Sequence, residues 1–183
     1  MDGPLNGRTG EELGRLPLRH GDEGIPTLAE VLDLVAGRVP LLIEVKDQTG
    51  VLGPVNGRLE EATVRALQGY EGPVALMSFN PHSVIALRDL APDLPRGLTT
   101  EGFDPKDWPS VPEEVCARLR EIPDYEAAGA CFISHHAPDL GRPRVAELKE
   151  QGAKVLCWTI RSAEQETLAR RMADNVTFEG YLA

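Results

Sequence analysis

Short apolar runs alternate with segments of helical spacing along the whole of this 183-residue chain, and this alternation limits the fold more than any other feature. Each apolar run is long enough for one strand, and the segments between them carry apolar residues three and four positions apart. Strands separated by helices are typical of a parallel sheet with right-handed crossovers. The expected strands cover residues 41–46, 74–78, 96–99, 130–134, 154–160 and 175–179.

Capping signals indicate where the expected helices begin and end. Thr27 followed three residues later by Glu30 is a capping box, and Gly37 stops that helix. A second helix covers residues 59–68. The other expected helices begin at Asn80-Pro81, at Ser110 with Glu113, at about residue 142, and at Ser162 with Gln165.

Two architectures with parallel strands compete for this pattern. A doubly wound open sheet normally has a glycine-rich phosphate turn after its first strand, and the sequence contains neither G-x-G-x-x-G nor G-x-x-x-x-G-K-[ST]. A TIM (β/α) barrel needs no such turn, but it needs eight strands and about 250 residues. The sequence therefore predicts an α/β fold, an incomplete TIM (β/α) barrel with about six of eight parallel strands, in a single domain over residues 1–183.

Composition excludes several classes of function. A formal net charge of −10 repels nucleic acid, and no segment concentrates Lys or Arg with aromatic residues. No apolar run approaches the roughly 20 residues of a membrane-spanning helix. The polar start of the chain has no signal-peptide pattern, so we expect cytoplasmic residence. Three cysteines without a Cys-x-x-Cys pair favour buried thiols over a disulfide framework or a zinc site.

The strand over residues 41–46 carries the most informative side chains. Alternate residues of a strand share a face, so Leu42, Glu44 and Lys46 point one way and three apolar residues point the other. The charged face lies toward the C-terminal end of the strand, where barrel enzymes build their active sites. A structural Glu-Lys pair and a functional site explain this spacing equally well, because buried charges must be either paired or turned toward ligand and water.

Other candidate residues lie at or near the ends of later strands. Trp158 and Phe79 are large enough to line a small-molecule pocket, although core packing suits them as well. Glu179 is either a second site carboxylate or a solvated terminus. For the four histidines we expect a surface or loop role, because nothing pairs with them in sequence; they are His20, His82, His135 and His136.

Five stretches of the chain together resemble the glycerophosphodiester phosphodiesterase family. The helix that begins Ile25-Pro26-Thr27 and the strand with Glu44-Val45-Lys46 look like that family's helix and Glu-x-Lys strand. The order and spacing of the stretches match over essentially the whole chain. The remaining three are Ser78-Phe79-Asn80-Pro81, Trp158-Thr159-Ile160-Arg161 and Asp174-Asn175-Val176-Thr177-Phe178-Glu179-Gly180.

The resemblance implies an activity and a set of roles. Members of the family hydrolyse glycerophosphodiesters to an alcohol and glycerol 3-phosphate with a divalent cation, usually Ca²⁺ or Mg²⁺. By position, Glu44 looks like a metal ligand and Lys46 like the lysine that contacts phosphate. Phe79 and Trp158 are similar to residues that line the glycerol side of the pocket.

The sequence also departs from the family pattern. The family begins with a His-Arg-Gly strand, a Glu-x-Asp strand and a His-Asp turn, and neither His-Arg-Gly nor His-Asp occurs in these 183 residues. We therefore expect an N-terminally truncated member that has no identifiable catalytic residue, binds the cation weakly and is inactive alone. The alternative is a non-catalytic pseudoenzyme or assembly module that binds phosphate-bearing ligands. Homo-oligomers would cover the two open sheet edges of either form.

Overall fold

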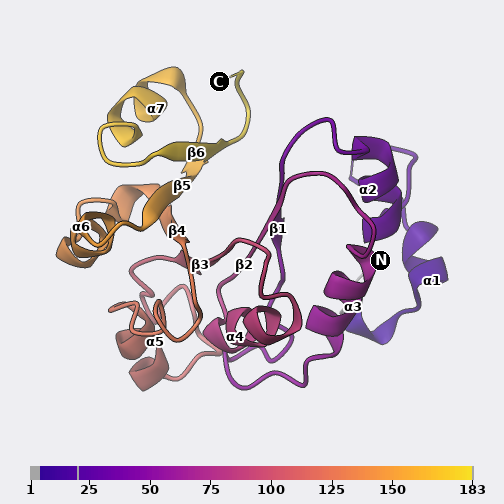
Figure 1. Cartoon of the computed structure of the whole chain (residues 1–183), viewed down its shortest axis with the longest axis horizontal. Helices are drawn as coiled ribbons and strands as arrows, with labels where there is room; N and C mark the ends of the chain where they lie inside the picture. The colour runs from indigo at the N-terminus through magenta and orange to yellow at the C-terminus, as the bar shows by residue number, and fades with distance from the viewer. Residues whose placement is uncertain (1–4, 20, 183) are drawn as a thin grey trace.

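The computed structural model describes residues 5–19 and 21–182, and it contains one parallel sheet (Figure 1). Neighbouring strands in the sheet are neighbours in sequence, in the order β1-β2-β3-β4-β5-β6, and every pair is parallel. The sequential order has no reversal point, which excludes the doubly wound alternative. The strands are β1 (Leu41–Glu44), β2 (Val74–Ser78), β3 (Arg96–Thr100), β4 (Phe132–His136), β5 (Lys154–Ile160) and β6 (Asn175–Phe178).

The six strands curl into a half-barrel with helices on its outer side, so the predicted fold class is confirmed (Figure 1). The described sheet has two open edges, one at β1 and the other at β6. The α-helices are α1 (Gly10–Gly14), α2 (Leu28–Val35), α3 (Arg58–Ala66), α4 (Pro81–Leu90), α5 (Glu113–Leu119), α6 (Pro143–Glu150) and α7 (Ala163–Ala169), and the two 3-10 turns are η1 (Leu5–Gly7) and η2 (Ala137–Asp139).

Most of the predicted helix starts are confirmed, and one is wrong. Thr27 caps α2 through its side-chain oxygen, which accepts from the Glu30 amide, and Asn80 caps α4 in the same way. Ser110 does not cap a helix, since α5 begins after Pro112. The helical conformation is disfavoured for the residue that precedes a proline, so the helix cannot include Val111. The sequence prediction also omitted α1, although Thr9 and Glu12 form a capping box there.

Strand β4 lies two residues later than predicted, at Phe132–His136 instead of 130–134. This shift places His135 and His136 within the strand, where they pair in register with Cys157 and Trp158 of β5. The expected strands 74–78 and 154–160 have the predicted bounds, and the remaining strands differ by one or two residues at an end.

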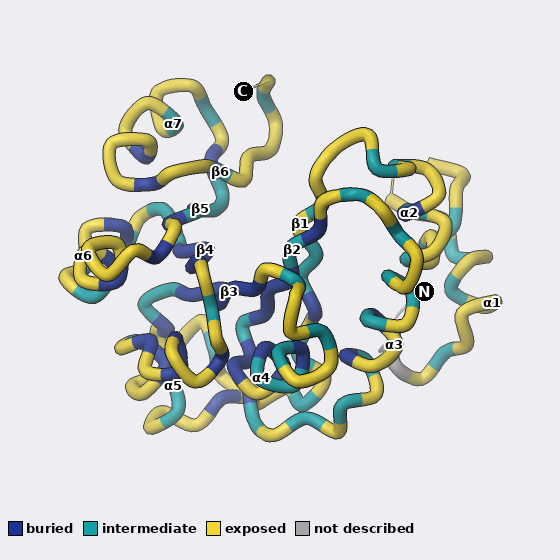
Figure 2. Tube along the Cα trace, in the orientation of Figure 1, coloured by how far each residue is buried: buried dark blue, intermediate teal, exposed yellow. Residues whose placement is uncertain are grey.

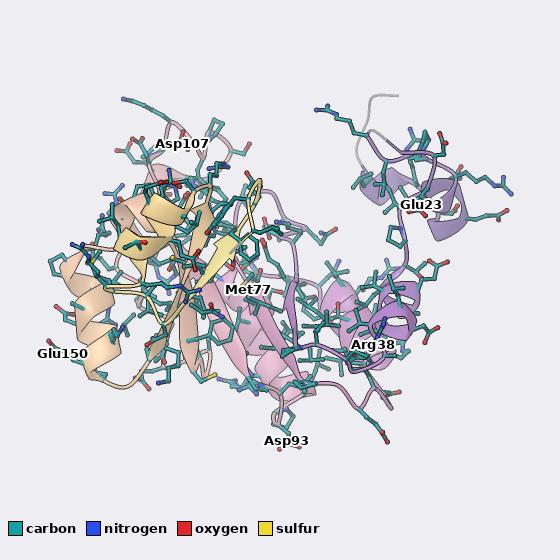
Figure 3. All side chains as sticks on the ribbon, turned by 90° about the horizontal axis from the view of Figure 1, so that it is seen from above. Glu23, Arg38, Met77, Asp93, Asp107 and Glu150 are labelled. Atoms are coloured by element: carbon teal, nitrogen blue, oxygen red, sulfur yellow. The ribbon has the colours of Figure 1, made fainter. Side chains whose placement is uncertain are left out.

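The main core lies between the outer face of the sheet and the helices. Ile133 and Val155 on adjacent strands are fully buried, as are Val84 on α4 and Leu148 on α6. Figure 2 shows buried residues concentrated in β2 to β5 and their helices, whereas the α1 and α2 region is mostly exposed. In Figure 3 the segment that carries Glu23 stands apart from the sheet around Met77. Among the described residues, no helix has the length and apolar content needed to cross a membrane.

The inner face of the half-barrel is closely packed where β3 meets β4. A Cβ atom on Gly97 would lie 2.3 Å from the ring of Phe132, the residue that Gly97 pairs with across the two strands. Glycine is therefore required at this position by the neighbouring ring.

We expect Gly97→Ala to lower the free energy of unfolding by about 1–3 kcal/mol, because the added methyl group overpacks the interior. Urea denaturation measures the change. Gly141→Ala is the matched control, since a Cβ there meets no atom within 4 Å and should change stability little. Combining Gly97→Ala with Phe132→Leu should restore part of the loss, and equal losses in the single and double variants would contradict this account.

Candidate functional site

Charged and aromatic side chains gather at the C-terminal ends of the strands. In a parallel sheet these ends share one edge, and alternation within each strand turns every second side chain toward the inside of the half-barrel. The inward-facing residues at this edge come from five different strands or the loops directly after them. They are Glu44, Lys46, Phe79, Glu101, His136 and Trp158.

Glu44 and Lys46 form an ion pair with 2.8 Å between Nζ and Oε1. The carboxylate side chain is 21% exposed and the ammonium side chain is 72% exposed. An exposed pair of this kind contributes little to stability, about 0–1 kcal/mol. Both groups therefore remain available to an anionic or cationic ligand. The pair found in the structure is compatible with both the structural and the functional interpretation of the sequence.

The loop after β1 is fixed by the next acidic residue, Asp47. Its carboxylate accepts hydrogen bonds from Asn80 Nδ2 at 2.7 Å and from the hydroxyl of Thr49 at 2.9 Å. Burial opposes ionisation of Asp47, but these bonds and those from the backbone outweigh it and lower the pKa of the carboxyl. Asp47 therefore holds the loop, and its bonding capacity is largely used within the protein.

Phe79 and Trp158, which the sequence singled out separately, are in contact. Their ring centroids are 5.5 Å apart in an edge-to-face arrangement. Phe79 directly follows β2, whereas Trp158 lies on β5. Trp108 lies 5.3 Å from Phe79 on one side, and His136 lies 4.9 Å from Trp158 on the other. We call Trp108, Phe79, Trp158 and His136 the aromatic row. It makes a continuous ring surface across the inner end of the half-barrel.

Glu101 and Trp108 are site residues that the sequence analysis missed. Glu101 follows β3, and its carboxylate accepts a hydrogen bond from the indole nitrogen of Trp108. The loop that carries both is held by Arg120, which donates to the carbonyl oxygens of Gly102 and Phe103 at 2.7 and 3.2 Å. Glu101 directly follows β3, and a position at a strand end is the signal that could have marked it, as for Phe79 after β2. Trp108 lies in an irregular loop without strand or helix periodicity, so no pattern in the sequence marked it.

The histidines occupy different environments from those expected. His135 is fully buried on the outer face of β4, so the prediction of a surface or loop role is wrong for it. Its Nδ1 lies 2.8 Å from the Thr100 hydroxyl, and burial lowers its pKa to about 4. His136 belongs to the aromatic row. His82 is exposed on α4, which confirms the surface role, and His20 lies outside the described residues.

Glu179 follows β6 and is paired with Arg161. The distance from Arg161 Nε to Glu179 Oε1 is 2.8 Å, and the Glu179 side chain is 59% exposed. Glu179 was considered as a site carboxylate or as a solvated terminal residue. The geometry matches the solvated role, because its carboxylate is exposed and pairs with Arg161.

The carboxylates do not by themselves make a site for a divalent cation. Across the described ranges, 5–19 and 21–182, no group of three or more His, Cys, Asp or Glu side chains is placed to hold a metal. Ca²⁺ takes six to eight oxygen ligands and Mg²⁺ takes six. Glu44 supplies one or two of these, and its partner in the structure is an ammonium group.

A parallel half-barrel with sequential strands and a cluster of polar and aromatic side chains at the strand ends defines the (β/α)-barrel class. Within that class, this chain belongs to the glycerophosphoryl diester phosphodiesterase family, a family of enzymes whose model matches residues 3–177. The resemblance found in the sequence is thereby confirmed. No curated protein sequence matches the chain.

Solved structures of similar fold include three phosphodiesterases. A phosphodiesterase from Oleispira antarctica, solved with the product sn-glycerol-3-phosphate, has a TM-score of 0.70 at 23% identity, covering 97% of this chain and 69% of its own. A glycerophosphodiester phosphodiesterase from Parabacteroides distasonis has a TM-score of 0.69 at 18% identity, covering 93% and 66%. One from Agrobacterium tumefaciens has a TM-score of 0.64 at 16% identity, covering 96% and 70%. The chain thus spans 66 to 70% of these structures.

Proposed function

We propose that this chain forms the glycerol phosphate-binding part of a glycerophosphodiester phosphodiesterase site. The observation that carries the proposal is the contact between Trp158 and Phe79, which follows the strand paired with β1; Glu44 ends β1 and Lys46 lies in the loop after it. Aromatic rings suit the carbon skeleton of glycerol, and an exposed ammonium suits a phosphate. The sn-glycerol-3-phosphate bound in the Oleispira antarctica phosphodiesterase supports this class of ligand.

Hydrolysis requires more than these residues supply. The family resemblance implies a divalent cation, for which Glu44 would be one ligand, and an acid and a base for the two oxygens of the scissile bond. His135 is buried and directed away from the site. His136 stacks on Trp158 and has no carboxylate partner among the described residues, and the described carboxylates do not converge on one point. We therefore propose that the 183-residue chain on its own binds glycerol phosphates and does not hydrolyse glycerophosphodiesters.

We expect Lys46→Gln to weaken the binding of sn-glycerol-3-phosphate about tenfold, because a charge-assisted hydrogen bond to phosphate is lost. Glu44→Gln should tighten binding in metal-free buffer, since it removes a negative charge and frees the Lys46 ammonium 2.8 Å away. Isothermal titration calorimetry measures both changes. Lys154→Gln is the matched control, because it removes the same charge from the first residue of β5, at the other end of the sheet.

Three results would contradict the proposal. One is the same affinity for the Lys46 and Lys154 variants, and another is no binding of sn-glycerol-3-phosphate at all. The third is release of choline from glycerophosphocholine by the chain with added Ca²⁺ or Mg²⁺, if Glu44→Ala abolishes that release. This last result would leave the binding site in place and show that the chain alone is an active enzyme.

A further inference from the structure

The Glu101 carboxylate, directly after β3, keeps most of its bonding capacity. Within residues 5–19 and 21–182 it takes part in no ion pair, and its one hydrogen bond comes from the uncharged indole of Trp108. A carboxylate has about four acceptor sites, so most of them are unused. The side chain is half-buried, and a charge in such a place needs a partner. Glu101 is therefore prepared for a partner that the protein itself does not supply.

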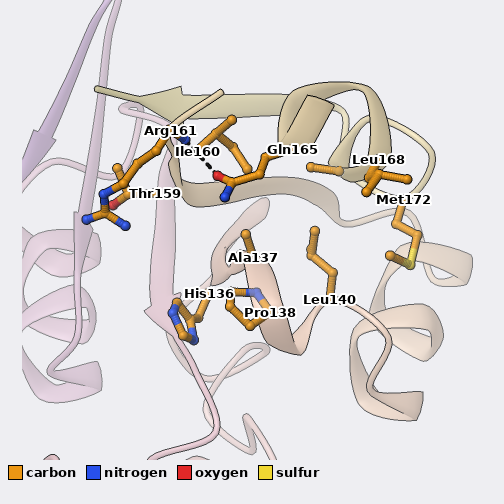
Figure 4. A pocket seen from close by; sticks show the side chains of 11 residues that line it. His136, Ala137, Pro138, Leu140, Thr159, Ile160, Arg161, Gln165, Leu168 and Met172 are labelled. Carbon is orange, nitrogen blue, oxygen red and sulfur yellow. Dashed lines mark hydrogen bonds between the residues drawn. The ribbon is translucent and has the colours of Figure 1, made fainter. Parts of the chain in front are cut away.

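Other acceptors around the aromatic row are already used within the protein. Glu44 and Glu179 are each paired with a basic side chain, and Asp47 holds its own loop. Figure 4 shows the surroundings of His136, at the far end of the row, where Gln165 Oε1 accepts from a backbone amide at 2.8 Å. A ligand hydroxyl on the aromatic row thus finds its available carboxylate at Glu101.

Glu101 and Lys46 lie at opposite ends of a short line of side chains. Lys46 comes after β1, Phe79 after β2 and Glu101 after β3, and these strands are consecutive neighbours in the sheet. Neighbouring strands lie about 4.8 Å apart, which separates the ends of β1 and β3 by about 10 Å. Trp108 connects the middle of the line to its acidic end, since its ring lies 5.3 Å from Phe79 and its nitrogen donates to Glu101. The line therefore has a cation, an aromatic surface and an anion in that order.

Glycerol phosphate is complementary to this line in one orientation. Its phosphate is anionic, its carbon skeleton suits an aromatic surface, and its free hydroxyl groups are hydrogen-bond donors. With the phosphate at Glu101, two negative charges would meet and repel each other. With the phosphate at Lys46, a hydroxyl group reaches the carboxylate, and both ends of the ligand form charge-assisted hydrogen bonds.

From this arrangement we propose that Glu101 binds the hydroxyl end of the glycerol and selects ligands that carry hydroxyl groups there. Trp108 holds one carboxylate oxygen, Oε1, and the other oxygen accepts from the ligand. This inference rests on the proposed function, because it assumes that the phosphate lies at Lys46 and the carbon skeleton on Phe79 and Trp158. It adds a specificity-determining residue to that site.

Two ligands test the inference, sn-glycerol-3-phosphate and propyl phosphate, which share the phosphate and the carbon chain and differ in the hydroxyl groups. We expect the unmodified chain to bind sn-glycerol-3-phosphate about tenfold more tightly, because propyl phosphate cannot donate to the Glu101 carboxylate. Isothermal titration calorimetry measures both affinities. Their ratio is the readout, since a change in the charge of the protein affects the phosphate of both ligands alike.

Substitutions of Glu101 should lower this ratio in two steps. Glu101→Gln keeps a neutral hydrogen-bonding group of the same size, and we expect a ratio of about three, because charge-assisted bonds are roughly twice as strong as neutral ones. Glu101→Met removes the acceptor and should bring the ratio to about one. Asp107→Asn is the matched control: it removes the same charge from an exposed position of the same loop, and the ratio should stay at about ten.

Trp108→Phe separates direct contact with the ligand from a role in holding the indole. It keeps an aromatic ring beside Phe79 and removes the N–H that donates to Glu101. If Glu101 binds the hydroxyl groups itself, both affinities change by a similar factor and the ratio persists. If Glu101 acted only by holding Trp108, the ratio would be lost in Trp108→Phe as well.

Three outcomes overturn the inference and leave the proposed function in place, as long as binding of sn-glycerol-3-phosphate depends on Lys46. The first is equal affinity of the unmodified chain for the two ligands. The second is a tenfold ratio that survives both Glu101→Gln and Glu101→Met, and the third is a ratio that Trp108→Phe abolishes as fully as Glu101→Met does. Failure of both ligands to bind contradicts the proposed function itself.

Discussion

Replacing Phe103 with alanine is expected to lower the free energy of unfolding by about 3–5 kcal/mol, the cost of removing a fully buried aromatic side chain. Phe103 is 1% exposed and lies in a cluster with Leu52, Val111 and Leu119. Its ring also contacts Phe79 at 6.4 Å and Trp108 at 5.4 Å, directly behind the aromatic row. A loss of this size is a large fraction of the 5–15 kcal/mol typical of a folded domain.

Urea denaturation followed by tryptophan fluorescence measures this change, because Trp108 belongs to the same cluster. Phe178→Ala is the matched control: it removes the same side chain from a position that is 44% exposed on β6, and it should cost much less. Similar losses in the two variants would show that Phe103 does not support the site. In the folded state, Phe103→Ala should also weaken sn-glycerol-3-phosphate binding, since Phe79 loses part of its packing.

Stability of the chain is expected to fall by about 2 kcal/mol between pH 7 and pH 5 because of one residue, His135. Burial lowers the pKa of His135 to about 4 in the folded state, whereas an unfolded chain has the ordinary value near 6.5. The folded protein therefore keeps this ring neutral while the unfolded chain takes up a proton. The contribution of the neutral His135 ring to the free energy of unfolding is complete above pH 6.5 and is lost as the pH falls from 6.5 toward 4.

Free energies of unfolding measured at intervals of pH test this expectation. His135→Gln should remove most of the dependence between pH 7 and pH 5, while its stability at pH 7 falls because the contact with Thr100 changes. His82→Gln, at an exposed position on α4, should keep the dependence of the unmodified protein. Carboxyl groups with a lowered pKa, such as Asp47, change the free energy of unfolding mainly below the interval from pH 7 to pH 5. An unchanged slope in His135→Gln would contradict the assignment.

The fold could be predicted from the sequence because local signals and the global pattern agree. The runs 74–78 and 154–160 are apolar on both faces and bounded by turn residues, so their strands have the predicted bounds. Strand β4 was placed two residues early because it ends in two histidines, which have no apolar pattern. The bond from Thr100 satisfies only Nδ1 of the buried His135, and its Nε2 has no hydrogen-bond partner among the described residues, so no sequence pattern would favour a histidine there.

The site was predicted only where a side chain lies on or directly after a strand. Glu44, Lys46, Phe79 and Trp158 met that condition, and the structure brings the two aromatic residues into contact. Trp108 could not be found in this way, because its place beside Phe79 depends on the path of an irregular loop. That path is set by tertiary contacts such as those of Arg120 with the carbonyl groups of Gly102 and Phe103.

The sequential order of the strands has a consequence for how the chain acquires its structure. Each strand pairs with the one that follows it, and the widest pairing between strands, Gly97 with Phe132, joins residues 35 positions apart. The loop-closure entropy of each pairing is therefore bounded, because it grows only slowly with the number of residues in the loop. No pairing within the described sheet requires the first and the last strand to meet, so each strand edge can form from residues that are close in the sequence.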